Sequence, residues 1–142
     1  MTIQQISVFA ENKVGNLAEL VSLLSDNAID LMAISLSETQ EYGVVRLIVS
    51  DAEKAAKLLS DNGWVHIVTP VLAVTMENKP GALAKLLALF AKEEIGVEYA
   101  YSFLSKEPHH VHMVFRVEDN EKASKALTAA GVRLVSDADL KM

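Results

Sequence analysis

The chain has 142 residues, of which 51% are hydrophobic, and 13 Lys and Arg stand against 19 Asp and Glu for a formal net charge of −6. This apolar content suffices for one packed core or for two small ones. The acidic balance and the lack of a basic cluster argue against nucleic-acid binding, which depends on cationic side chains that meet phosphates. The chain has no cysteine, which excludes disulfides, thiolate zinc sites and thiol nucleophiles.

No apolar run approaches the roughly 18 residues that a membrane helix needs. The first five residues, Met1 to Gln5, contain neither a basic nor an apolar signal region. We therefore expect a cytoplasmic protein that has no membrane contact.

The first half of the sequence predicts the element order β-α-β-β-α-β. Alternating apolar residues predict strands with one buried face, and apolar residues at i, i+3, i+4 and i+7 predict a helix. The expected elements are a strand at 6–10, a helix at 17–24, strands at 29–36 and 44–49 around a hairpin loop, a helix capped by Asp51 and ending near Gly63, and a strand at 64–68 that ends at Pro70.

The second half repeats this pattern. Residues 77–90 are a near copy of residues 11–24 at an offset of 66, and residues 119–131 resemble residues 51–63 at an offset of 68. Two extra residues therefore lie between about Phe103 and His112, where we expect a surface turn near Lys106. The expected elements of this half are a strand at 71–76, a helix at 81–94, strands at 97–104 and 110–117, a helix at 120–130 and a short strand near 133–135.

This order predicts an α+β fold of two ferredoxin-like βαββαβ units, each an antiparallel sheet with helices on one face. We expect the first domain at residues 1–69 and the second at residues 70–142. The bare sheet faces are not uniformly polar, and the candidates for them include Phe9, Ile34, Ile48 and Val114. Because such surfaces favour a partner, we predict a homodimer. Side-by-side and face-to-face pairing of the domains both stay open.

Two strand-to-helix turns carry a motif that is also repeated. They read Asn12-Lys13-Val14-Gly15-Asn16-Leu17 and Asn78-Lys79-Pro80-Gly81-Ala82-Leu83. Together with Ile95-Gly96-Val97-Glu98-Tyr99, they resemble the ACT domain, a regulatory module that binds amino acids. The resemblance covers both halves of the chain.

The physics of the turn agrees with a ligand site. Gly15 and Gly81 let a ligand approach the backbone closely. The first amides of the following helix have no intrahelical partners, and with the helix dipole they form a small anion site that suits a carboxylate. The alternative is that these residues only shape a tight connection between strand and helix.

In the family that the motif resembles, paired domains bind an amino acid at their interface, with contacts from this loop of one domain and the second strand of its partner. Carried over to this sequence, the resemblance implies the ligand-binding residues Asn12, Val14, Gly15, Asn16, Leu17, Asn78, Pro80, Gly81, Ala82, Leu83 and Glu98. The family commonly has Asn at the second-strand position, where this chain has Glu98 in one half and Met32 in the other. If the domains pair side by side, the turn at Asn12 faces the strand that carries Glu98 and is the better equipped for a zwitterion.

Other candidates give weaker signals. His110 and His112 would share one strand face and could hold a divalent metal with a third ligand, although a half-exposed hairpin is the more common interpretation. Tyr99, Tyr101 and Phe103 alternate along one face, where they could stack on a ligand ring or pack in a core or interface. The sequence has no nucleophile motif and no phosphate loop, so we expect no catalysis, no metal and no cofactor.

The sequence therefore predicts a non-catalytic regulatory protein that binds a free amino acid and reports its level to a metabolic enzyme or regulator. The alternative is a regulatory or structural subunit that acts by protein–protein contact without a ligand. A small enzyme or metal protein that uses the histidine hairpin is a third, weaker interpretation.

Overall fold

Alternating apolar residues on the strands and apolar stripes on the helices form two cores in the computed structural model, which describes residues 1–11, 13–38 and 42–140. The chain divides into two units. The first unit consists of Gln4–Thr69 together with Leu140, and the second consists of Pro70–Asp139 together with Met1–Ile3.

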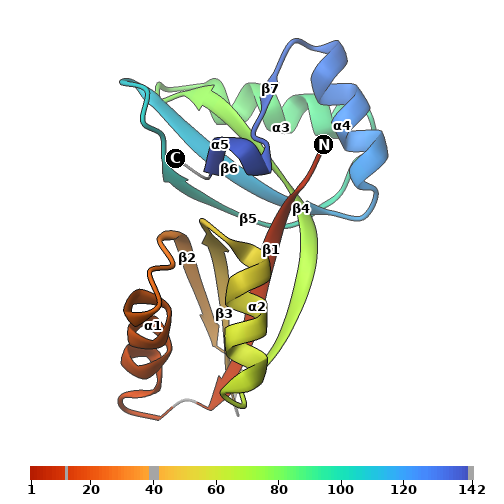
Figure 1. Cartoon of the computed structure of the whole chain (residues 1–142). Helices are drawn as coiled ribbons and strands as arrows, with labels where there is room; N and C mark the ends of the chain where they lie inside the picture. Colours follow the sequence, from red (N-terminus) through yellow and green to blue (C-terminus); the bar gives the residue numbers. More distant parts are fainter. Residues whose placement is uncertain (12, 39–41, 141–142) are drawn as a thin grey trace. The chain divides into compact units, whose positions relative to one another are not determined.

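The first unit is a sheet with two helices on one face. Its elements are β1 (Ile3–Glu11), α1 (Asn16–Asp26), β2 (Leu31–Glu38), β3 (Tyr42–Val49), α2 (Ala52–Asp61) and the first part of β4 (Val65–Glu77), shown in Figure 1. β3 pairs antiparallel with both β1 and β2, and β4 lies beside β1 in the strand order. The strand residues Ile6, Val8, Val45 and Leu47 pack in one core with Leu20 and Leu24 of α1 and Ala55 and Leu59 of α2.

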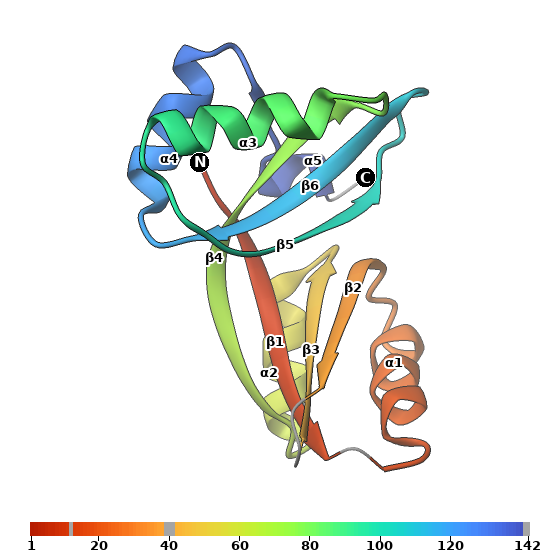
Figure 2. The ribbon, with the colours of Figure 1, turned by 180° about the vertical axis from the view of Figure 1, so that it is seen from behind.

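The second unit repeats this arrangement. Its further elements are α3 (Ala82–Lys92), β5 (Val97–Leu104), β6 (His110–Val117), α4 (Asn120–Ala129), β7 (Arg133–Leu134) and α5 (Asp137–Leu140). β6 pairs antiparallel with β4 and β5, and β7 pairs antiparallel with β4. In its core the rings of Phe90 and Phe115 meet edge to face, with centroids 5.2 Å apart. α3 and α4 cover one face of the sheet, and α5 lies on the other face (Figures 1 and 2).

The fold is therefore the predicted α+β fold with two ferredoxin-like βαββαβ units and helices on one face of each antiparallel sheet. The connection between β5 and β6, residues 105–109, is two residues longer than the connection between β2 and β3, residues 39–41, as the repeat offsets predict. Residues 39–41 themselves lie outside the described residues. No helix in the described part of the chain is long and apolar enough to cross a membrane.

The prediction of a strand end at Pro70 is wrong, because β4 continues through this proline from Val65 to Glu77. Proline has no N–H to give to a ladder, but its fixed φ is compatible with extended backbone. The ladder of β4 with β6 begins at Leu72, after the proline. The carbonyl of Pro70 accepts a hydrogen bond from Asn120 Nδ2 at 3.1 Å, which ties this point of the strand to α4.

The position expected for Ile34 is also wrong. Ile34 pairs with Leu47, which belongs to the core beneath the helices, so Ile34 lies on the helix-covered face rather than on the bare face. Phe9 and Ile48 occupy the bare face of the first sheet, since they alternate with core residues. Val114 occupies the bare face of the second sheet and is fully buried.

The bare faces of the two sheets differ in polarity. In the first unit this face carries Gln5 and Ser7, which are both buried, and Arg46, which pairs with Ser7 across the ladder. Gln5 Nε2 donates to Ser7 Oγ at 3.2 Å, and Arg46 Nη1 donates to Ser37 Oγ at 2.9 Å. The equivalent residues of the second unit are apolar and buried: Val71, Ala73 and Val114.

Candidate functional site

The two repeated turns have the same backbone geometry. Gly15 is the N-cap of α1 with φ 91°, and Gly81 is the N-cap of α3 with φ 89°. This left-handed conformation favours glycine, which has no Cβ to clash. Among the described residues outside each turn, no atom lies within 4 Å of the position that a Cβ would occupy. Each turn is therefore open on the side where a ligand would approach.

The four longer helices differ in how their N-termini are capped. Asp51 accepts a hydrogen bond from the N–H of Lys54 in α2, and Asp119 accepts one from the N–H of Lys122 in α4, both at 3.1 Å. α1 and α3 have glycine at the N-cap and no side-chain cap. The first helical N–H of each closes the turn onto the carbonyl of Lys13 or Lys79, and the next amides of the first turn have no side-chain cap. These amides suit an external anion, and the helix dipole favours negative charge at the same place.

A Glu–Lys ion pair stands beside each turn. The Lys13 and Glu11 side chains are 2.6 Å apart, and so are those of Lys79 and Glu77. The hydrogen bond from Lys13, helped by its charge, holds the pKa of the Glu11 carboxyl below its ordinary value, and in return Glu11 raises the pKa of Lys13. Each turn thus carries the same Glu–Lys pair.

The two turns close differently. In the first, Asn16 Nδ2 donates to the carbonyl of Glu11 at 2.8 Å, and its backbone N–H donates to Lys13 at 3.2 Å. In the second, the N–H of Ala82 makes the same backbone bond, to the carbonyl of Lys79 at 3.3 Å, but Ala82 offers no such side chain, and the N–H of Asn78 donates to the carbonyl of His109 at 2.7 Å.

The remaining predicted turn residues take different places. Val14 and Leu17 are exposed, Leu83 packs against the second core, and Pro80 precedes the N-cap Gly81. Asn12, a predicted ligand contact, lies outside the described residues.

Glu98 lies on β5 and is paired within its own sheet. Its carboxylate is 3.4 Å from Nε of Arg116 on β6, and both side chains are partly exposed to solvent. Arg116 also donates from Nη1 to the carbonyl of Val117 at 2.8 Å. Within the second unit, Glu98 is therefore beside a guanidinium rather than in the hydrogen-bonded turn. The ammonium of a zwitterion could bind to Glu98 and its carboxylate to Arg116, since the pair offers an anion and a cation together.

The family model for the ACT domain pair matches residues 1–142. The chain belongs to this family. Among solved structures, protein BT0572 from Bacteroides thetaiotaomicron is similar, with 36% sequence identity and a TM-score of 0.92 over 99% of this chain and 96% of that chain. No match to a curated protein was found.

Two regulatory subunits have the same fold as this ACT domain pair. The ligand-free regulatory subunit of aspartate kinase from Thermus thermophilus has 18% identity and a TM-score of 0.63 over 89% of this chain and 91% of its own. The corresponding subunit from Thermus flavus has 17% identity and a TM-score of 0.60 over 90% and 92%.

Phe103 and His112 of the ACT pair lie against each other in the second unit. The rings of Phe103 and His112 are 4.8 Å apart between centroids, and His112 Nδ1 is 2.9 Å from Thr75 Oγ1. His110 Nδ1 donates to the carbonyl of Pro108 at 2.8 Å. In the part of the chain that the structure describes, no three side chains of the metal-binding types are grouped to hold an ion.

His112 should make the stability of the ACT pair depend on pH. Burial, together with the charge of Arg133, lowers the pKa of His112 from its ordinary value of 6.5, although Asp139 and Glu107 oppose the shift. The unfolded chain therefore binds more protons than the folded chain below about pH 6.5, and stability is lost as the pH falls from there through the folded pKa. Urea unfolding between pH 7.5 and 5 should show a shallower pH dependence for His112→Gln than for the parent. An unchanged slope would contradict this role.

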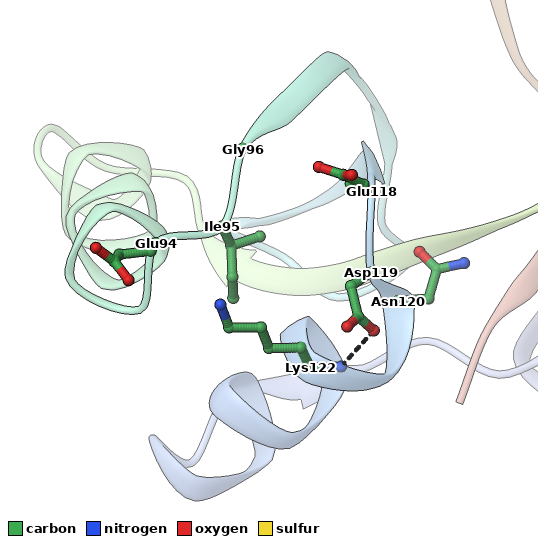
Figure 3. A pocket seen from close by; sticks show the side chains of 7 residues that line it. All are labelled: Glu94, Ile95, Gly96, Glu118, Asp119, Asn120 and Lys122. Atoms are coloured by element: carbon green, nitrogen blue, oxygen red, sulfur yellow. Dashed lines mark hydrogen bonds between the residues drawn. The ribbon is translucent and has the colours of Figure 1, made fainter.

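A hollow lies where the chain passes from α3 to β5 and from β6 to α4 (Figure 3). It has a volume of about 500 Å³, and its acidic residues are Glu94, Glu118 and Asp119. Figure 3 shows the Asp119 carboxylate turned toward the backbone N–H of Lys122, which is its capping role. The hollow thus follows from the cap and the helix end, and we assign no ligand to it.

The left-handed turn itself can be tested in the ACT pair. Gly81→Ala should destabilise the protein by roughly 1–2 kcal/mol, because a Cβ strains a backbone with positive φ even where space is open. Gly96→Ala is the matched control, since Gly96 also has open space around it but an ordinary φ. Chemical denaturation of both variants gives the comparison. Equal free energies of unfolding would show that the turn is not strained.

The sequence motif finds the glycine turns but misses two cations near the second turn. Lys85 and Arg133 line a groove beside it, whereas Ala82 alone of the predicted site residues does so. Comparison of the two halves could have found them, because the equivalent residues of the first half are Glu19 and Val65.

Proposed function

We propose that the chain is a non-catalytic regulatory protein that binds a small amino acid through its repeated glycine turns. The contrast between the helices carries this proposal. α1 and α3 begin at equivalent uncapped glycines, whereas α2 and α4 are capped by their own aspartates. An uncapped N-terminus at a fixed left-handed turn suits a ligand carboxylate. Membership of the ACT domain pair family supports the same function.

Each part of the ligand has a proposed partner. The carboxylate would accept from the first-turn amides after Gly15 or Gly81. Val14, Asn16 and Leu17 in the first turn, and Asn78, Pro80, Ala82 and Leu83 in the second, would form the surrounding wall. The ammonium would donate to a side-chain oxygen, for which Asn12 and Glu98, the carboxylate on β5, are the two candidates.

Binding would then be reported to a partner. The fold is shared with regulatory subunits of aspartate kinase, and we propose by analogy that ligand binding changes a contact with a metabolic enzyme or regulator. A second candidate function is protein–protein contact without a ligand. It is favoured by the exposed apolar residues Val65, Ile67 and Val68 at the start of β4.

A thermal-shift screen of the chain against the twenty amino acids tests the proposal. An amino acid at 100 times its Kd adds about 2.7 kcal/mol to the free energy of unfolding. We expect at least one amino acid to raise the melting temperature in a concentration-dependent way. If no amino acid raises the melting temperature at millimolar concentration, amino-acid binding is wrong and protein–protein contact without a ligand becomes the proposed function.

We also propose that the chain forms a homodimer. Val65 is 67% exposed and Ile67 is 54% exposed, and burial of these two side chains in a contact would be favourable. Sedimentation velocity at micromolar concentration should show a dimer, and Ile67→Glu should shift the population toward monomer. Only monomer for the parent chain at this concentration would contradict the proposal.

A further inference from the structure

A groove on the second unit runs along the first two turns of α3 and past the end of α4. Its volume is about 670 Å³. Its floor is apolar and is formed by Met76, Leu86, Leu89 and Val132, which also belong to or pack against the second core. This volume is within the range of about 300–1,000 Å³ that is usual for small-molecule sites.

The rim of this groove is cationic. Lys79, Lys85 and Arg133 line it, and the acidic residue in the lining is Glu77. The positive field acts on Glu77, because the hydrogen bond and charge of Lys79, with smaller contributions from His110 and Lys85, lower the pKa of its carboxyl. This is a positively charged hollow on a chain whose net charge is −6.

Two of the cations have defined partners. Lys79 is paired with Glu77 at 2.6 Å, and Arg133 Nη2 is paired with Glu107 Oε1 at 2.7 Å. Lys85 forms no ion pair with any described residue. Because a guanidinium has five N–H donors, Arg133 retains donors beyond the one that Glu107 uses.

The first half of the chain gives an internal comparison, since it has the same turn and a different groove sequence. Lys85 corresponds to Glu19, and Arg133 corresponds to Val65. Val132 corresponds to Trp64, whose larger side chain packs against the first core. The two copies therefore share the glycine turn and its lysine, Lys13 or Lys79, whereas the cations Lys85 and Arg133 and the small side chain of Val132 belong to the second copy alone.

We propose that this groove binds a small organic anion, a carboxylate with an aliphatic body. The carboxylate contacts Lys85 and Arg133, and the aliphatic body packs on Leu86, Leu89 and Val132. The cations of the rim favour an anion over a neutral or cationic molecule, and the apolar floor favours an aliphatic body over a polar one. This site is separate from the proposed amino-acid site, with which it shares only Ala82.

Hexanoate, hexanol and hexylammonium are matched probes, because they share an alkyl body and differ in charge. In an amide-detected NMR titration of the full chain, hexanoate should shift the amides of residues 76–89 and 130–133. Hexylammonium should not shift them. The affinity of hexanol should be lower than that of hexanoate by about tenfold or more. Equal binding of hexanol and hexanoate, or shifts elsewhere only, would overturn the proposal.

The first half supplies the test substitutions. Lys85→Glu and Arg133→Val should each weaken hexanoate binding by about tenfold or more. Val132→Trp should also weaken it, because the larger side chain fills the space above the apolar floor. Lys92→Glu is the matched control on the same helix and should bind as the parent does, since Lys92 does not line the groove. Arg133→Lys keeps the charge and should recover most of the binding lost in Arg133→Val.

The outcomes separate this site from the amino-acid site. If the groove variants lose hexanoate binding and keep the amino-acid response of the parent, the two sites are distinct. If Lys85→Glu, with an unchanged fold by its amide spectrum, binds hexanoate as the parent does, the proposal is wrong. That result would leave the amino-acid proposal unaffected, because the screen tests it separately.

Discussion

Glu98→Gln is expected to weaken binding of the best amino acid by about tenfold or more, because a charge-assisted hydrogen bond contributes roughly 1.5–3 kcal/mol. The substitution keeps the size of the side chain and removes the negative charge that the ligand ammonium would need. Isothermal titration calorimetry gives the affinity. The exposed pair with Arg116 is lost too, but a surface pair contributes only about 0–1 kcal/mol to stability, so the fold should survive.

Three further variants show which turn is used. Met32→Ala changes the equivalent position of the other half and should alter the affinity less than Glu98→Gln does. Gly15→Val should weaken binding by narrowing the first turn, at a cost of about 1–3 kcal/mol for a β-branched residue at positive φ. If Glu98→Gln binds as the parent does and Gly81→Val abolishes binding, the site is at the second turn.

Phe115→Ala is expected to reduce the free energy of unfolding by about 3–5 kcal/mol. Phe115 is fully buried and meets Phe90 edge to face, so the truncation removes both the buried area and the ring contact. Urea denaturation followed by circular dichroism measures the loss. Leu104→Ala is the control, because Leu104 is 90% exposed and its truncation should change stability by less than about 0.5 kcal/mol. Equal effects of the two substitutions would contradict the assigned core.

The regular elements could be predicted from the sequence because their patterns are local and occur twice. Strands β5 and β6 have the predicted bounds, since alternation and turn residues limit them at both ends. The continuous β4 could not be predicted, because its neighbours in the sheet, β1 and β6, lie far from it in the sequence. α5 has four residues, too few to show helical periodicity, so no expectation was possible for it.

The candidate site was predictable to a smaller extent. The glycine turns could be recognised because a positive φ at a helix start selects one residue type. The neighbours of Glu98 could not be predicted, because the residue that lies beside a β5 side chain depends on the register of β5 with β6. Here an irregularity between Val97 and Tyr99 shifts the pairing with β6 and brings Arg116 beside Glu98. The groove cations were also missed, since α3, α4 and β7 meet there only in the folded unit.

The division of the chain into units has a consequence for its synthesis. Leu140, which is buried, belongs to the first unit, although the rest of that unit ends at Thr69. A ribosome that adds about 5–20 residues per second makes Leu140 roughly 4–14 s after Thr69. The nascent first unit therefore lacks this buried residue until Pro70–Asp139 of the second unit have been made.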